Sequence, residues 1–216
     1  MPEKYKNLLF DLDGTIIDPK EGITTSIQYA LKKLGAEKIP SSDELTWGIG
    51  PSLVHSFPKL FGKEDKELAQ KCVEYYREYF SKKGIFQCFL YDGIKDILTE
   101  LSTSSKLFLA TSKPGIFALQ ILELFELKHL FTGVYGSEFD GRFMNKADLI
   151  AHLLKIEKLN VSECLMIGDR KHDIIGAKVN NMESCGVLWG YGSRKELSEA
   201  GVSFLVEKPE GLLKLK

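Results

Sequence analysis

Long apolar runs are missing from this 216-residue sequence, and no stretch approaches the roughly 20 apolar residues that a membrane-spanning helix requires. The first residues carry charges inside and beside a short apolar run, so we expect no signal peptide. An excess of either charge is also missing, because 29 basic and 30 acidic residues leave a formal charge of −1. Without a global field to recruit them, we expect neither a nucleic-acid polymer nor a membrane as a partner.

Cysteine is scarce and scattered. The four cysteines show no C-x-x-C or Cys/His spacing of the kind that indicates a zinc site. A disulfide framework is not expected at this size and cysteine density, which favours free thiols in a reducing compartment. No internal repeat or low-complexity tract is present. These absences predict a cytoplasmic globular protein made of one domain, or of one domain with a large insertion.

Short apolar runs predict six buried strands in a mainly parallel sheet. The runs lie at residues 8–10, 107–110, 133–135, 165–167, 186–188 and 204–206. Between most of them lie segments of helical length whose apolar residues recur every three or four positions, as from Ile94, Phe117 and Leu149. Strands alternating with helices predict an α/β fold with a doubly wound, Rossmann-like sheet. A short closing helix is expected from Pro209 onward.

The segment from residue 20 to residue 85 breaks this alternation. It contains three helical stretches in succession, which are 23–34, 52–60 and 65–80. A helical block inserted after the first strand is most simply a small cap domain over the carboxyl edge of the sheet, where open α/β sheets hold ligands. The sequence therefore predicts an α/β core formed by residues 1–19 and 86–216 and a cap formed by residues 20–85.

Two aspartates directly follow the first predicted strand, residues 8–10. Asp11 and Asp13 stand two residues apart, so their side chains share one face of an extended chain, and Gly14 permits a sharp turn. Carboxylates this close repel each other unless a cation or a shared proton intervenes. A divalent metal, with one carboxylate free as nucleophile or acid/base, is the economical explanation. An ordinary strand-end turn is the alternative on these residues alone.

A second acidic turn follows the strand predicted at residues 165–167. Asp169 comes after Gly168 at the tip of that strand, and Asp173 is expected one helical turn away on the same side. An aspartate at a helix N-terminus is also a routine cap, so Asp173 alone is weak evidence. Asp169 together with the first aspartate pair is much harder to explain by capping.

Two further segments suit a phosphorylated ligand. Thr111 and Ser112 place hydroxyls at the tip of the strand predicted at residues 107–110, where N–H groups that open a helix form an anion seat. Lys146, three residues before the apolar helix face that begins at Leu149, could project toward the same edge. Without that context, Thr111 reads as a capping hydroxyl and Lys146 as a surface lysine.

These segments resemble the four motifs of the haloacid dehalogenase-like hydrolase superfamily, in the same order and at plausible spacing. The match covers nearly the whole chain and includes a helical cap after motif one. Within the superfamily the chain looks most like the phosphoglycolate phosphatase group and related nucleotidases. The matching residues are Asp11-Leu12-Asp13-Gly14-Thr15 for motif one, Thr111 for motif two, Lys146 for motif three, and Gly168-Asp169 with Asp173 for motif four.

The resemblance implies a magnesium-dependent phosphatase that forms an aspartyl-phosphate. Asp11 would attack phosphorus, and Asp13 would protonate the leaving alkoxide and then deprotonate the hydrolytic water. Mg²⁺ would be held by Asp11, the main-chain carbonyl of Asp13 and Asp169. Asp173 would orient these ligands from behind.

The resemblance also implies where the substrate binds. Thr111, Ser112 and Lys146 would bind the phosphoryl oxygens of a small phosphorylated metabolite. Substrate choice would lie in the cap, which would close over the substrate. The cap candidates are Glu21 and the loop residues Gly50, Pro51 and Ser52, and an ordinary interhelix loop is an equally good reading of the last three.

Several alternatives stay open. The dehalogenase branch of the superfamily lacks the second carboxylate of motif one, so Asp13 favours phosphate chemistry. A 5′-nucleotidase keeps both aspartates, as does a sugar-phosphate mutase, although the Pro-rich run that such mutases often show after motif three is absent from Lys146-Ala147-Asp148-Leu149. A receiver that stores phosphate to bind a partner, or a binding protein without activity, is less well supported. We expect a monomer or a weak homodimer.

Overall fold

The structure, a computed structural model, describes residues 4–50, 57 and 65–215. The chain divides into two compact units, Met1–Asp18 with Leu90–Lys216 and Pro19–Phe89. The division falls one and four residues away from the boundaries expected at 19/20 and 85/86. The second shift arises because residues near 87 pair with the helical unit, where the N–H of Gly22 donates to the carbonyl of Gln87 at 2.9 Å.

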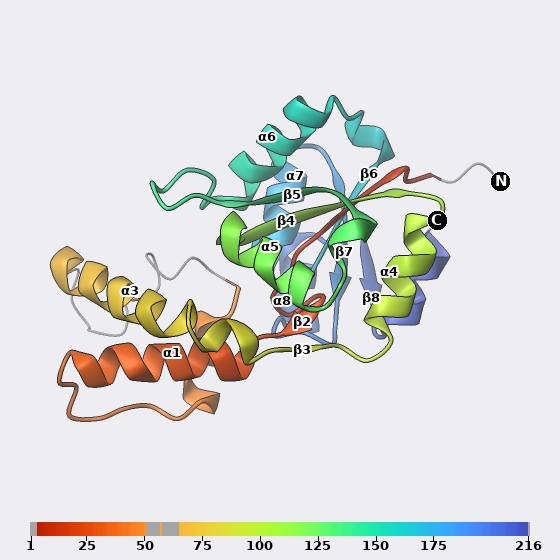
Figure 1. Cartoon of the computed structure of the whole chain (residues 1–216). Coiled ribbons are helices and arrows are strands. Elements are labelled where there is room, and N and C mark those ends of the chain that lie inside the picture. Colours follow the sequence, from red (N-terminus) through yellow and green to blue (C-terminus); the bar gives the residue numbers. More distant parts are fainter. Residues whose placement is uncertain (1–3, 51–56, 58–64, 216) are drawn as a thin grey trace. The chain divides into compact units, whose positions relative to one another are not determined.

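The first unit is built on a six-stranded parallel sheet in the order β5-β4-β1-β6-β7-β8 (Figure 1). The predicted α/β fold with a doubly wound, mainly parallel sheet is therefore confirmed. From β1 the chain adds β4 and β5 on one side and then β6, β7 and β8 on the other, so β1 lies at the topological switch point. The strands are β1 (Asn7–Phe10), β4 (Lys106–Pro114), β5 (Phe131–Ser137), β6 (Cys164–Gly168), β7 (Glu183–Val187) and β8 (Phe204–Val206).

Helices cover both faces of this sheet (Figure 1). The side chain of Asn145 caps α6 (Lys146–Glu157) by accepting from the N–H of Ala147, and Ser193 caps α8 (Arg194–Ala200) by accepting from the N–H of Glu196. The chain closes on a 3₁₀ helix, Pro209–Leu215, where a short helix was expected. The helices are α4 (Ile94–Ser102), α5 (Gly115–Leu124), α6 (Lys146–Glu157), α7 (Lys171–Val179) and α8 (Arg194–Ala200).

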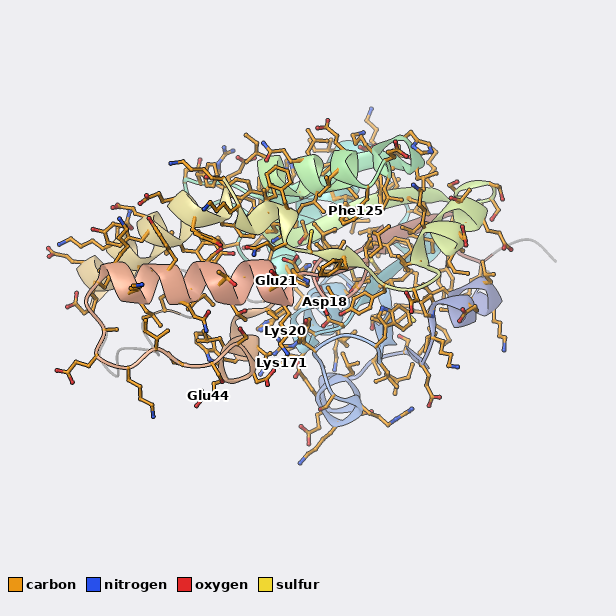
Figure 2. The ribbon with its side chains drawn as sticks, turned by 60° about the horizontal axis from the view of Figure 1, so that its bottom comes forward. Asp18, Lys20, Glu21, Glu44, Phe125 and Lys171 are labelled. Carbon is orange, nitrogen blue, oxygen red and sulfur yellow. The ribbon has the colours of Figure 1, made fainter. Side chains whose placement is uncertain are left out.

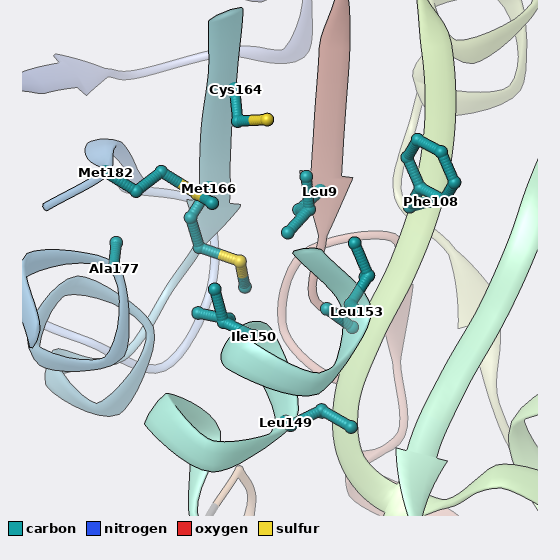
Figure 3. Close-up of a cluster of buried hydrophobic side chains, with 10 residues drawn as sticks. Leu9, Phe108, Leu149, Ile150, Leu153, Cys164, Met166, Ala177 and Met182 are labelled. Atoms are coloured by element: carbon teal, nitrogen blue, oxygen red, sulfur yellow. The ribbon is translucent and has the colours of Figure 1, made fainter. Parts of the chain in front are cut away.

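One layer of the core lies between the sheet and the helices α6 and α7. Leu9, Phe108 and Met166 come from three neighbouring strands and share one face, because their strands are in register. Ile150 and Leu153 of α6 pack against them, and all five side chains are fully buried (Figure 3). This packing fixes the start of α6, and with it Lys146, over the carboxyl edge of β1.

The second unit is helical. Its elements are α1 (Lys20–Lys33), a 3₁₀ helix (Asp43–Gly48) and α3 (Lys66–Phe80). Asp65 caps α3 by accepting from the N–H of Leu68 at 3.0 Å. The helix expected at residues 52–60 lies outside the described residues apart from Phe57.

Two short strands, β2 (Ile17–Asp18) and β3 (Phe89–Leu90), pair with each other at the unit boundaries. Among the described helices, none combines the length and the apolar character that crossing a bilayer requires. The four cysteines are buried free thiols.

The core layer yields a stability prediction. Leu153→Ala should lower the free energy of unfolding by about 2–5 kcal/mol, because it opens a cavity between α6 and the sheet. Ile156→Ala, three residues along the same helix at a side chain that is 55% exposed, should change it by less than about 1 kcal/mol. Urea unfolding followed by circular dichroism measures both values. Equal costs for the two variants would show that this layer does not stabilise the unit.

Candidate active site

Three buried aspartates converge at the carboxyl ends of β1 and β6. Phe10 and Ile167 are partners in the parallel ladder, and the N–H of Asp11 donates to the carbonyl of Ile167 at 2.8 Å. Asp11 and Asp169 therefore leave adjacent strands side by side. Asp11, Asp169 and Asp173 each offer a carboxylate oxygen, and these oxygens all lie within 4.8 Å of one another.

A buried ammonium ties this cluster to a third strand. Nζ of Lys146 lies 2.9 Å from Oδ1 of Asp11 and 2.8 Å from Oδ1 of Asp173, and it donates to the carbonyl of Ala110 at 2.7 Å. Burial disfavours the charged form, but the two carboxylates more than offset it and raise the pKa of Lys146. The ammonium therefore stays charged, with hydrogen bonds to Asp11 and to the carbonyl of Ala110 and an ion pair with Asp173.

Asp169 is the most enclosed carboxylate of the cluster. Its Oδ2 accepts from the N–H of Tyr191 at 2.7 Å, while its Oδ1 is buried without a hydrogen-bond partner among the described residues. Burial, and then the charges of Asp173 and Asp11, raise the pKa of Asp169 well above its usual value. The chain passes very close, since a Cβ on Gly14 (φ +83°) would lie 2.2 Å from Oδ2 of Asp169. Only glycine fits there.

Asp173 is both a helix cap and a member of the cluster. Its Oδ2 accepts from the N–H of Arg170 at 3.1 Å, which caps α7, while its Oδ1 faces Lys146. Burial raises the pKa of Asp173, although Lys146 opposes the shift. A Cβ on Gly168 would lie 2.3 Å from Oδ2 of Asp173, so the backbone of β6 closes one side of this carboxylate.

Asp13 has a partner that sequence reasoning missed. Nζ of Lys113 lies 3.0 Å from Oδ2 of Asp13, and both side chains are buried. Burial raises the pKa of Asp13, Lys113 opposes the shift, and Asp11 adds to it. A signal was present in the sequence, because Lys113 stands two residues after Thr111 and an extended chain points both side chains to one face.

The expected phosphate seat lies on the neighbouring strand. Thr111 is buried, and its Oγ1 accepts from the N–H of Lys113 at 3.2 Å. The carbonyl of Ser112 accepts from the hydroxyl of Ser137 at 2.9 Å, which ties β4 to β5. No contact joins the Ser112 side chain to the carboxylate cluster among the interactions of the described residues, so its role in binding phosphate stays a prediction.

The charges of the site suit a divalent cation. Four carboxylates (Asp11, Asp13, Asp169 and Asp173) share the buried space with the two ammoniums of Lys113 and Lys146. The ionised set carries two more negative than positive charges, and the unpartnered Oδ1 of Asp169 offers a ligand atom. Carboxylate oxygens are the ligands that Mg²⁺ prefers. These residues therefore fit a magnesium ion.

The cap candidates are only partly described. Glu21 lies at the start of α1 (Figure 2), where its Oε1 accepts from Nε2 of Gln87 at 2.9 Å. Gly50 follows the 3₁₀ helix Asp43–Gly48 by two residues and has a φ of +99°. Pro51 and Ser52 lie outside the described residues. Their roles in substrate choice stay predictions.

The chain is similar to known proteins in both sequence and structure. Residues 8–187 match the haloacid dehalogenase-like hydrolase family, and the chain belongs to that family. It is 45% identical to a 5′-nucleotidase of Pseudomonas aeruginosa, over 90% of this chain and 87% of the relative. A structure described as a predicted phosphatase from Clostridium acetobutylicum superposes with a TM-score of 0.93 at 40% identity, covering 97% of both chains.

Other relatives carry different names. The tyrosine-protein kinase PtkA of Mycobacterium tuberculosis is 35% identical over 88% of this chain but only 64% of the relative. A phosphoglycolate phosphatase of Vibrio parahaemolyticus is 27% identical over 99% of this chain and 96% of the relative. The family match and the phosphatase relatives identify the chain as a phosphoric monoester hydrolase.

The cluster yields a prediction about metal. In chelator, Asp169→Asn should raise the melting temperature, because it removes one of three mutually repelling buried carboxylates. Mg²⁺ at 100 times its dissociation constant should stabilise the wild-type protein by about 2.7 kcal/mol and the variant far less. Asp148→Asn, an exposed aspartate in the first turn of α6, is the matched control and should behave as wild type. Equal stabilisation of wild type and Asp169→Asn by Mg²⁺ would contradict the assignment of this metal site.

Proposed function

We propose that the protein is a magnesium-dependent phosphatase that hydrolyses a small phosphate monoester through an aspartyl-phosphate on Asp11. One observation above all supports this proposal. Lys146 binds Oδ1 of Asp11 at the topological switch point of the sheet. A second carboxylate, Asp13, follows two residues later and forms a separate ion pair with Lys113. Two buried carboxylates held separately in this way suit two different tasks.

The first task is nucleophilic attack. The Lys146 contact fixes Oδ1 of Asp11, and this orients the carboxylate for attack on phosphorus. The second task is proton transfer by Asp13, whose raised pKa favours a carboxyl group able to give a proton to the leaving alkoxide. The same group would then take a proton from the water that hydrolyses the intermediate.

The remaining residues would bind the transferred group. Thr111 lies at the same edge as Asp11, because Leu109 and Phe10 are ladder partners, and its hydroxyl would donate to a phosphoryl oxygen. Lys146 would add positive charge there. Asp11, Asp169 and the main-chain carbonyl of Asp13 would hold magnesium, which would neutralise charge on the phosphoryl oxygens. Asp173 forms an ion pair with Lys146 and accepts a hydrogen bond from the N–H of Arg170, and it would orient these magnesium ligands.

Two substrate classes come first. The name of the 45% identical relative favours nucleoside 5′-monophosphates over phosphoglycolate, for which the named relative is only 27% identical. The kinase activity in the name of PtkA is not carried over, because this chain matches only 64% of that protein. We further propose a cytoplasmic enzyme of small metabolites that works as a monomer or a weak homodimer.

The test is hydrolysis of 4-nitrophenyl phosphate and of a panel of nucleoside monophosphates, phosphoglycolate and sugar phosphates. Wild type should release inorganic phosphate only with Mg²⁺, and Asp11→Asn should lower kcat at least about 10⁴-fold because the nucleophile is lost. Turnover that survives both chelation and Asp11→Asn would overturn the proposal. Transfer of phosphate between positions of a sugar phosphate, without release, would identify a mutase instead. A large loss of turnover in Asp13→Asn would exclude a receiver, which needs only phosphate acceptance.

A further inference from the structure

The two oxygens of Asp13 have unequal surroundings. Oδ2 lies 3.0 Å from Nζ of Lys113, in an ion pair whose side chains are only 9% and 5% exposed. Oδ1 is buried and has no hydrogen-bond partner among the described residues. A buried carboxylate whose one oxygen is paired with an ammonium cannot rotate to exchange its oxygens without breaking that pair. The two oxygens are therefore not interchangeable.

Both partners of this ion pair are fixed by their backbones. Strand β4 runs on to Pro114, and the N–H of Lys113 donates to Oγ1 of Thr111. After Asp13 the chain turns back at once, with the N–H of Gly14 donating to the carbonyl of Ile17 at 2.8 Å. Lys113 thus holds Asp13 from the strand that also carries the expected phosphate seat.

We infer that Lys113 is a positioning residue that binds Oδ2 of Asp13 and so assigns both proton transfers of the reaction to Oδ1. The inference rests on the proposed function. In the first step the proton on Oδ1 passes to the ester oxygen as its bond to phosphorus breaks and the bond from Asp11 to phosphorus forms. In the second step Oδ1 takes a proton from water as the water oxygen bonds to phosphorus and the bond to Asp11 breaks.

This arrangement makes the need for Lys113 depend on the leaving group. Phenolate is a basic leaving group and departs with the help of a proton, whereas 4-nitrophenolate departs without one. The first step alone governs kcat/KM when formation of the phosphoenzyme is irreversible. Hydrolysis of the phosphoenzyme needs Asp13 as the base for either substrate, so a defect in this second step lowers kcat. Two aryl phosphates of nearly equal size therefore separate proton delivery from binding.

The test compares Lys113→Met with wild type on phenyl phosphate and 4-nitrophenyl phosphate. For phenyl phosphate, kcat/KM should fall about 100-fold, within the range that a positioned proton donor contributes. For 4-nitrophenyl phosphate, kcat/KM should change by less than about threefold while kcat falls. A burst of one 4-nitrophenolate per enzyme should appear in stopped-flow traces, because the phosphoenzyme accumulates.

Two lysines serve as controls. Lys146→Met removes a group that contacts the nucleophile, so it should lower kcat/KM for both substrates by a similar factor. Lys106→Met, at the exposed start of the same strand β4, should leave both values unchanged. Equal loss on both substrates in Lys113→Met, or no loss on either, would overturn the inference.

A double-mutant cycle covers the case in which Lys113→Met leaves Asp13 charged, buried and unpaired, so that the variant does not fold. Asp13→Asn with Lys113→Met removes both charges, and it should match Asp13→Asn alone within about twofold on phenyl phosphate, because Lys113 acts only through Asp13. A further loss of about tenfold would overturn the inference. Absence of Mg²⁺-dependent hydrolysis in the wild type would instead overturn the proposed function.

Discussion

The ammonium of Lys146 is the interaction on which the whole site depends. Three carboxylates whose oxygens lie within 4.8 Å of one another would repel in a space closed to water. One ammonium bound to Asp11, Asp173 and the carbonyl of Ala110 relieves that repulsion and ties α6 to the ends of β1, β4 and α7. The packing of α6 on the sheet places this charge, so the apolar core serves the site directly.

A second lysine, Lys113, gives the two neighbouring aspartates different partners. Asp11 is held from α6 through Lys146, and Asp13 is held from β4 through Lys113. The two carboxylates are close in sequence, but each is positioned by a different element of the fold. In the proposed mechanism, that separation would let Asp11 act as the nucleophile while Asp13 carries protons. What the lysines leave uncompensated is a net negative charge that suits a divalent cation.

The sequence predicts the sheet and the aspartates of the site, and the features that it does not predict have physical reasons. Asp11 and Asp169 follow unmistakable apolar strands, so their meeting at one edge could be predicted. Lys113 was missed because the apolar run of β4 ends at Ala110, although the strand itself continues to Pro114. The β7 strand was expected at residues 186–188 but spans Glu183–Val187, because Glu183 and Ser184 conceal its start. The neighbour that buries a polar side chain cannot be read from local sequence.

The most direct test of the account is to find the phosphorylated residue. Borohydride added to the enzyme during turnover of 4-nitrophenyl phosphate with Mg²⁺ reduces an aspartyl-phosphate to homoserine, which tandem mass spectrometry locates. An aspartyl-phosphate on Asp11 predicts homoserine at position 11 in wild type and none at any position in Asp11→Asn. Homoserine at another aspartate, or active enzyme trapped during turnover with Asp11 unmodified, would contradict it.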